Sequence, residues 1–246
     1  MLAIIAEKEA AIFIPNDDWP DGCPVIGDGP FIPDPEMEAI IVEKEAAMFG
    51  QKSEADPCSN DLAIPQMPQE TEIWSGYAAI QSLLSFEGIT KTQTQIANSV
   101  YSTDSACPWY LANENTLSQF PAAGYLNSQI SGYNYVPYPY GDAGATPPTE
   151  SELKTRVKYT INNGHGVLAC GTSNASTAHE SHLPMYPAAS ISHWIVVKGY
   201  SSYGDNVLIA DPVKSSAVSW SGSIEAKYDI PLSKLTASVA PKGIIY

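Results

Sequence analysis

Four polar residues have the types and the spacing that nucleophilic catalysis requires: Gln69, Ser75, His193 and Asp211. Ser75 follows Gln69 by six residues and opens an apolar segment, which places its hydroxyl at the N-terminus of an expected helix. His193 begins an apolar, strand-like run, and Asp211 follows the next such run eighteen residues later. From there Asp211 can accept the Nδ1–H of the imidazole and hold Nε2 toward the nucleophile. The four residues therefore predict a nucleophile, a base, a carboxylate that orients the base and, in Gln69, a donor to an oxyanion.

The position of Ser75 suits a cysteine better than a serine. A helix N-terminus presents unpaired backbone N–H groups and the positive end of the helix dipole, which together stabilise a thiolate and a developing oxyanion. A hydroxyl is much harder to deprotonate than a thiol, whose ordinary pKa is about 8.5. We therefore expect Ser75 to preserve the geometry of such a site and to disable its chemistry.

The elements that must position these residues follow from periodicity and from capping residues. We expect helices over residues 75–87, 92–100, 113–123 and 150–163, and strands over residues 166–171, 193–200, 206–210, 216–219 and 243–246. Trp74 and Trp194 adjoin the nucleophile position and the base, so we expect them to line a substrate cleft; packing in the core explains them equally.

Residues 62–246 resemble the papain-like cysteine peptidases related to the bacteriocin-leader peptidases. Three segments carry the resemblance: IPQ…Q…WSGYAA, where that family normally reads Trp-Cys-Gly-Pro-Ala, then HWIVVKGY and IADP. The resemblance implies an α+β fold with the nucleophile helix packed on an antiparallel sheet. It also implies hydrolysis of peptide bonds by a Cys-His-Asp mechanism that needs no cofactor. In this implied site Ser75 replaces the cysteine, His193 is the base, Asp211 orients it and Gln69 donates to the oxyanion.

Two features of the sequence limit what the resemblance implies. Ser75 removes the thiolate, and Tyr77 replaces the usual proline of the first helical turn. The sequence contains no double glycine, so the cleavage specificity of the leader peptidases is not carried over.

A duplicated segment marks the N-terminal region. Residues 3–13 read AIIAEKEAAIF and residues 39–49 read AIIVEKEAAMF, so that only two of the paired positions differ. Each copy is predicted to form a short amphipathic helix, although the Ile-Ile start also permits a strand. The connector between the copies is rich in Pro, Gly and Asp and is expected to be extended. We place the domain boundary near residue 60, with a pro-region over residues 1–60 and a papain-like catalytic domain over residues 61–246.

Charge and hydropathy exclude several classes of function. The 246-residue chain has a formal net charge of −15 and no basic patch, which argues against nucleic acid as a partner. No run of eighteen apolar residues occurs, so no membrane-spanning segment is expected. The first residues lack the basic region of an intact secretory signal.

The cysteines bear on location and on metal binding. None of the four lies in a CxxC pair or has a His at zinc-ligand spacing, so no metal site is expected. An even number in a chain rich in Tyr, Ser and Asn favours a secreted or extracytoplasmic protein, and free buried thiols explain them nearly as well. Cys170, inside an apolar run, is expected to be a plain core thiol. The four are Cys23, Cys58, Cys107 and Cys170.

The preferred interpretation is the precursor, or zymogen, of a papain-like endopeptidase that Ser75 has inactivated. Its partners would be a peptide or protein substrate and its own N-terminal segment, which would occlude the cleft. A natural pseudo-peptidase that binds a peptide without cutting it is one alternative. A transglutaminase-like acyltransferase on the same fold is another, since the same triad serves either reaction.

Overall fold

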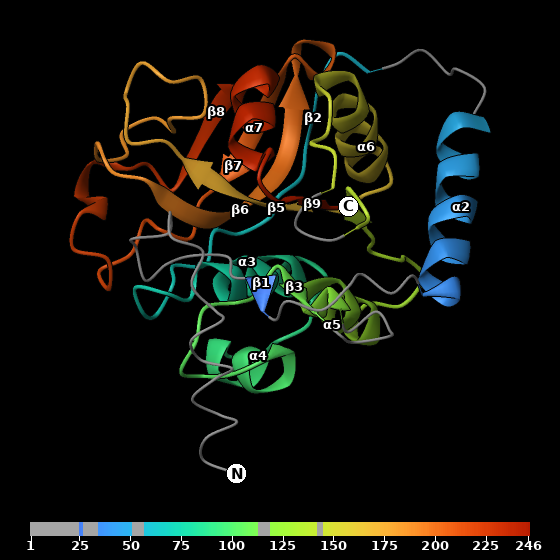
Figure 1. The fold of residues 1–246 in the computed structure, drawn as a ribbon, viewed down its shortest axis with the longest axis horizontal. Helices are drawn as coiled ribbons and strands as arrows, with labels where there is room; N and C mark the ends of the chain where they lie inside the picture. The colour runs from blue at the N-terminus through green and yellow to red at the C-terminus, as the bar shows by residue number, and fades with distance from the viewer. Residues whose placement is uncertain (1–24, 27–33, 51–56, 113–118, 142–144) are drawn as a thin grey trace.

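An antiparallel sheet forms the centre of the molecule (Figure 1). The computed structural model of the chain describes residues 25–26, 34–50, 57–112, 119–141 and 145–246. Six strands of the seven-stranded sheet follow one another in the order β4 (Pro137–Tyr138), β9 (Gly243–Ile245), β5 (Val167–Ser173), β6 (Ile191–Ser201), β7 (Asn206–Ala210) and β8 (Lys227–Pro231). The seventh, β2 (Asn60–Asp61), pairs with the end of β6. Each pairing in this sheet is antiparallel.

Helices cover both faces of the sheet. One face carries α3 (Ser75–Phe86), α4 (Gln93–Val100) and α5 (Pro121–Gln129), and the other carries α6 (Glu150–Asn162) and α7 (Leu232–Val239). The side chains of β6 alternate between the two faces, as the pleat of a strand requires. Trp194 and Val196 belong to the core beneath α3, whereas Ile195 and Val197 belong to the core beneath α6 and α7. The strand that carries His193 is therefore buried on both sides.

Three smaller features complete the described chain. The backbone of β1 (Val25–Ile26) pairs in parallel with β3 (Tyr110–Leu111). Two short 3-10 helices, η2 (Ser202–Gly204) and η3 (Ser221–Ser223), occupy turns. The helix α2 (Pro35–Gly50) lies at the edge of the molecule beside α6 (Figure 1). No described helix has the length and apolar character needed to cross a membrane.

Most of the elements predicted from the sequence are confirmed. The predicted α+β class is correct. Thr92 and Thr149 are the N-cap residues of α4 and α6, and each forms a reciprocal capping box with a residue three positions later. The predicted helix over 113–123 is wrong in its bounds: α5 begins at Pro121, and residues 113–118 lie outside the described part.

The predicted strand over residues 216–219 is wrong. These residues form turns, because the hydroxyls of Ser215 and Ser221 bind nearby main-chain groups and compete with a ladder of strand hydrogen bonds. The strand that completes this side of the sheet is β8, and the helix α7, which the sequence analysis missed, follows it directly.

The second copy of the duplicated segment forms the helix predicted for it, α2. It contacts the domain through one stripe, in which Met37, Lys44 and Met48 are buried. The carboxylate of Glu45 on the same helix forms an ion pair with Arg156 of α6. The first copy lies outside the described residues.

Candidate active site

Ser75 is the first residue of α3, as predicted, and its side chain is buried. The helix has no side-chain N-cap: the preceding residue, Trp74, makes no capping hydrogen bond. The first-turn amides are therefore free of a capping side chain and point out of the helix end. The hydroxyl Oγ of Ser75 accepts a hydrogen bond of 3.3 Å from the main-chain N–H of Trp194, the residue after His193.

The second residue of α3 must be glycine because another loop lies against it. A Cβ atom added to Gly76 would lie 2.3 Å from Cβ of Cys107 and 2.9 Å from Cδ1 of Trp194. Trp194 Nε1 in turn donates to the main-chain oxygen of Cys107 at 3.1 Å. The loop at Cys107, the first turn of α3 and the strand β6 are thus in direct contact at the nucleophile position.

His193 and Asp211 form the pair that the sequence predicts, with the two imidazole nitrogens exchanged. Nε2 of His193, and not Nδ1, lies 2.7 Å from Oδ1 of Asp211. The expectation that Nδ1 binds the carboxylate is therefore wrong. The register explains the contact: β6 and β7 pair with Val196 opposite Ala210, so that Asp211 follows the end of the ladder toward His193. The nitrogen on the far side of the ring from Asp211 is Nδ1.

Asp211 is fully buried and accepts hydrogen bonds from four groups. In addition to His193, the main-chain N–H of Val213 donates to Oδ1 at 3.0 Å. The hydroxyls of Tyr186 and Tyr228 donate to Oδ2 at 2.8 Å and 2.6 Å. Burial opposes ionisation of the carboxyl, but the charge of His193 and these hydrogen bonds outweigh it, so the pKa of Asp211 lies below its ordinary value.

The two tyrosines were not found by sequence reasoning. Tyr186 belongs to the loop before β6, and Tyr228 belongs to β8. Burial and the neighbouring carboxylate raise the pKa of Tyr228 well above its ordinary value, so its hydroxyl remains a donor. Nothing in the local sequence distinguishes these two from the chain's other tyrosines; only the return of β8 beside β7 brings Tyr228 to Asp211.

Gln69 connects the nucleophile segment to the loop after Asp211. Its amide Nε2 donates to the main-chain oxygens of Thr71 and Glu72 at 2.8 Å and 2.9 Å. Its main-chain oxygen accepts from Ser215 Oγ, and its N–H donates to Pro212. Both amide hydrogens are thus engaged in the turn that leads to Ser75, and a role for Gln69 as oxyanion donor stays a prediction.

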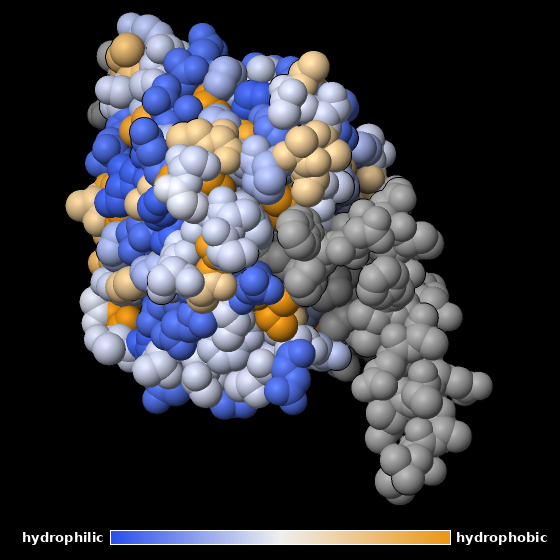
Figure 2. All heavy atoms as spheres, turned by 90° about the vertical axis from the view of Figure 1, so that its left-hand side faces the viewer, coloured by the Kyte–Doolittle hydropathy of each residue, from blue (hydrophilic) through white to orange (hydrophobic). Residues whose placement is uncertain are grey.

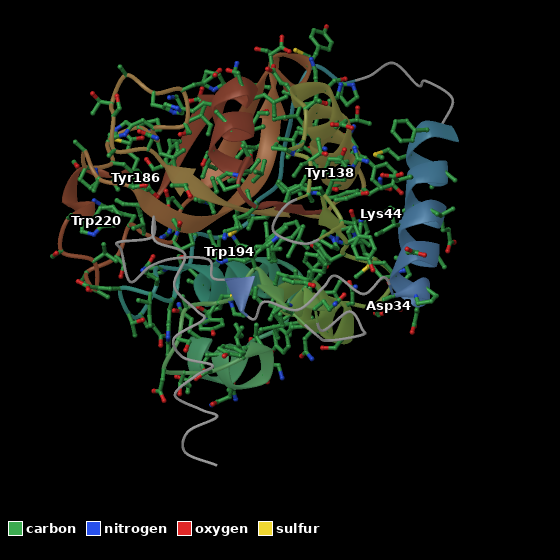
Figure 3. The ribbon with its side chains drawn as sticks, viewed as in Figure 1. Asp34, Lys44, Tyr138, Tyr186, Trp194 and Trp220 are labelled. Atoms are coloured by element: carbon green, nitrogen blue, oxygen red, sulfur yellow. The ribbon has the colours of Figure 1, made fainter. Side chains whose placement is uncertain are left out.

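Trp74 and Trp194 both lie in the core beneath the site. Trp194 is 1% exposed, and its ring packs on Trp109 with centroids 5.8 Å apart. Trp74 is 7% exposed and meets Tyr77 edge to face. Figure 3 shows Trp194 between the sheet and α3. The structure thus favours the core interpretation, and a role for the two tryptophans in substrate binding stays a prediction.

The cysteines differ from expectation at one position. Cys170 is disulfide-bonded, so the prediction of a plain core thiol is wrong. Cys107 is a buried free thiol whose pKa burial raises, and Cys58 is an exposed free thiol. Cys23 lies outside the described residues.

The surface beside the site is polar and hollowed. A cavity of about 400 Å³ lies in the loop that follows Asp211 and is lined by residues 214–222. A second cavity, of about 540 Å³, lies away from the site, between α2 and residues 137–141. Figure 2 shows that hydrophilic residues dominate the face on the loop side and that apolar residues occur there in small, separate groups. Ser75 and His193 are 1% and 3% exposed, so both side chains are buried in this structure.

The arrangement defines a class of protein. A nucleophile position opens a buried helix, the helix packs on an antiparallel sheet, and a His–Asp pair occupies the neighbouring strand ends. This is the architecture of the papain-like cysteine peptidases. The uncapped first turn of α3 begins at Ser75, and His193 is bound by Asp211.

The chain belongs to the Peptidase_C39-like family, whose model matches residues 61–230. A comparison with the curated proteins finds no match. Among solved structures, a double glycine motif protease from an AMS/PCAT transporter, solved with its leader peptide, is similar at 16% identity and a TM-score of 0.42, over 76% of this chain and 91% of that one. Xylellain, a cysteine protease from Xylella fastidiosa, is similar at 12% identity and a TM-score of 0.44, over 95% and 98% of the two chains.

Proposed function

We propose that this chain is the precursor form of a papain-like cysteine endopeptidase in which Ser75 stands at the nucleophile position and prevents cleavage. The observation that carries the proposal is the buried His193–Asp211 pair, in which the two side chains lie 2.7 Å apart. The residue after His193, Trp194, donates its main-chain N–H to Ser75. A binding module has no need of a base held by a fully buried carboxylate. Membership of a peptidase family supports the same conclusion.

With a cysteine at position 75, the reaction would follow from the groups already in place. The thiol would give its proton to His193, and the thiolate would attack the peptide carbonyl. The first-turn N–H groups of α3 would bind the oxyanion, and His193 would return the proton to the leaving amine. Water, deprotonated by His193, would then hydrolyse the thioester and release the acid. Asp211 would stabilise the imidazolium in both steps.

The N-terminal region would act as a pro-segment that covers the site. Two observations support this proposal: Ser75 and His193 are nearly inaccessible in the full chain, and β1 pairs with β3 next to Trp109, which packs on Trp194. The helix α2 is not the covering part. It lies at the α6 edge, and Figure 3 places Lys44 on the opposite side of the molecule from Tyr186 and Trp220. We assign α2 the role of an anchor.

A natural pseudo-peptidase that binds a peptide is a second candidate. The observation that favours it is the engagement of the catalytic groups: Gln69 is committed to two carbonyls, and the hydroxyl of Ser75 accepts from Trp194. The two candidates differ in one respect, which is whether a thiol at position 75 restores cleavage.

The test is therefore Ser75→Cys in the full chain, with the intact mass followed over time. We expect an N-terminal fragment ending near residue 60 to be released, since the family match begins at residue 61. A thiol alkylator should stop the release. Two controls apply, because the chain already holds free thiols: the unchanged chain and Ser75→Cys combined with His193→Ala should both stay whole. A Ser75→Cys chain that stays whole, and that cuts no peptide library, contradicts the peptidase proposal and leaves the pseudo-peptidase.

We also propose that the protein works outside the cytoplasm. The disulfide at Cys170 supports this location, because such bonds persist in oxidising compartments. Thiol counting on protein isolated from its source without reductant checks it. A chain that arrives fully reduced contradicts the proposed location.

A further inference from the structure

We propose that the surface that binds α2 is a receptor for the duplicated segment and that it also binds the first copy, residues 1–14, in exchange for α2. This inference is independent of whether the chain cuts peptides. It rests on which residues of α2 contact the domain and on what stands at the same positions in the first copy.

The contacts of α2 are specific and unusual. Lys44 is 7% exposed, and its Nζ donates to the main-chain oxygens of Asn134 and Tyr246 at 2.6 Å and 2.5 Å. The same nitrogen lies 4.1 Å and 4.5 Å from the ring centroids of Tyr133 and Tyr246. Oxygens and ring faces together form a pocket for one lysine head group.

Arg156, next to this pocket, binds a second residue of α2, Glu45. Arg156 is 4% exposed, forms an ion pair with Glu45, and stacks over Tyr138 at 3.4 Å from the ring centroid. The receptor surface therefore recognises a Lys-Glu pair on one helix, flanked by the apolar contacts of Met37 and Met48. Because a lysine pocket lies beside an arginine that pairs with a carboxylate, the surface selects for a Lys-Glu sequence and not only for an apolar stripe.

The first copy has the same residue at three of these four positions and another apolar residue at the fourth. With the offset of thirty-six, Lys44 and Glu45 correspond to Lys8 and Glu9, Met37 to Met1, and Met48 to Ile12. The last pair exchanges one apolar side chain for another of similar size, which a contact of this kind tolerates.

The other differences between the copies fall away from the contact. Val42, which is Ala6 in the first copy, is 67% exposed in α2. Glu38, which is Leu2 in the first copy, is also exposed. Both of these substitutions therefore fall on exposed positions, and three of the four contacting residues recur unchanged in the first copy.

The consequence is competition between two segments of one chain for one surface. Whichever copy is bound, the other is released, and it is available to a second molecule. Because both are tethered to the same domain, neither depends on a free ligand concentration.

The experiment uses the full chain with Met48→Cys as a reporter of α2 release. This thiol is protected while α2 is bound, and its alkylation is read site by site by mass spectrometry, apart from Cys58 and Cys107. A synthetic peptide of residues 1–14 should accelerate alkylation at position 48 in a saturable manner, by about tenfold or more. The same peptide with Lys8→Ala and Glu9→Ala should have no effect.

A peptide of residues 37–50 serves as the matched positive control. If it accelerates alkylation and the 1–14 peptide does not, the proposal is wrong. If neither does, it is also wrong, because a surface that never releases α2 cannot bind the first copy. Should Met48→Cys fail to fold, Met37→Cys reports from the other end of the same face.

Discussion

The candidate active site and the α2 receptor surface each bury a titratable side chain, and the two sites form hydrogen bonds to it in different ways. Asp211 is bound by His193, Tyr186 and Tyr228, which come from the sheet and its connecting loop. Lys44 is bound by two main-chain oxygens and two ring faces, and burial lowers its pKa to about 6. The carboxylate is bound by groups from the sheet and its loop, whereas the Lys44 amino group comes from a helix at the edge of the domain.

The Asp211 network is therefore expected to be needed for folding of the domain, whereas α2 is expected only to bind to the folded domain. Removal of Asp211 would leave several buried donors without an acceptor in the middle of the sheet. Removal of α2 contacts would leave a surface that water can reach. We therefore expect site substitutions to lower the stability of the whole domain and α2 substitutions to affect only the docking of one helix.

The largest effect is expected for Asp211→Ala. The substitution leaves His193, Tyr186 and Tyr228 without their acceptor, and we expect a loss of about 3–5 kcal/mol in the free energy of unfolding. Urea denaturation measures it, with Asp229→Ala as the control, since Asp229 is exposed on β8. Equal stability of the two variants would show that the buried network contributes nothing to the fold.

The next effect concerns the contact between α3 and the Cys107 loop. Gly76→Ala places a Cβ 2.3 Å from that of Cys107, and we expect a loss of about 1–3 kcal/mol from overpacking. Gly222→Ala is the control, because no atom lies within 4 Å of its added Cβ. Cys107→Gly should restore part of the loss in the Gly76→Ala background. If it restores none, the clash lies elsewhere.

The pH dependence of stability follows from Asp211. Its pKa is lowered in the folded state, so its contribution is complete above the unfolded value of about 3.9 and is lost as the pH falls through the folded value. The stability difference between the unchanged chain and Asp211→Asn should therefore shrink below about pH 4. Glu152, whose pKa is lowered to about 2 by the capping Thr149, titrates in both proteins and cancels. A difference that stays constant to pH 2.5 (roughly the lower limit for such a series) would contradict the assignment.

The smallest effect is expected at the α2 edge. Glu45→Gln removes the charge that faces Arg156, but the carboxylate side chain is 34% exposed, so the change should cost less than about 1 kcal/mol. Glu43→Gln, on the exposed side of the same helix, is the control. If Glu45→Gln destabilises the domain as much as Asp211→Ala does, α2 is part of the folding unit and the contrast between the two regions disappears.

The sequence predicts the order and the type of the site elements well, because each rests on a local signal. Thr92 and Thr149 predict the starts of α4 and α6, and the apolar runs after His193 and before Asp211 predict the strands β6 and β7. What could not be predicted depends on pairing between distant segments. The choice of Nε2 over Nδ1 depends on the orientation of the imidazole ring in the folded core, and the contact of Tyr228 with Asp211 depends on the return of β8.

The same limit applies to the N-terminal region. The repeat predicts the helix α2, because the helical spacing of its apolar residues is visible within the segment itself. It does not predict where α2 binds, because Asn134, Arg156 and Tyr246 come together only through the pairing of β4 with β9 and the packing of α6. Nor could burial of a lysine be expected from a pattern that normally puts Lys in water.

The position of β6 has a consequence for the motions of the protein. This strand pairs with β5, β7 and β2, carries His193, and offers the amide of Trp194 to Ser75. Hydrogen exchange of that amide with solvent therefore requires the start of α3 to move away from β6, and its rate reports how often the nucleophile position separates from the strand that carries the base.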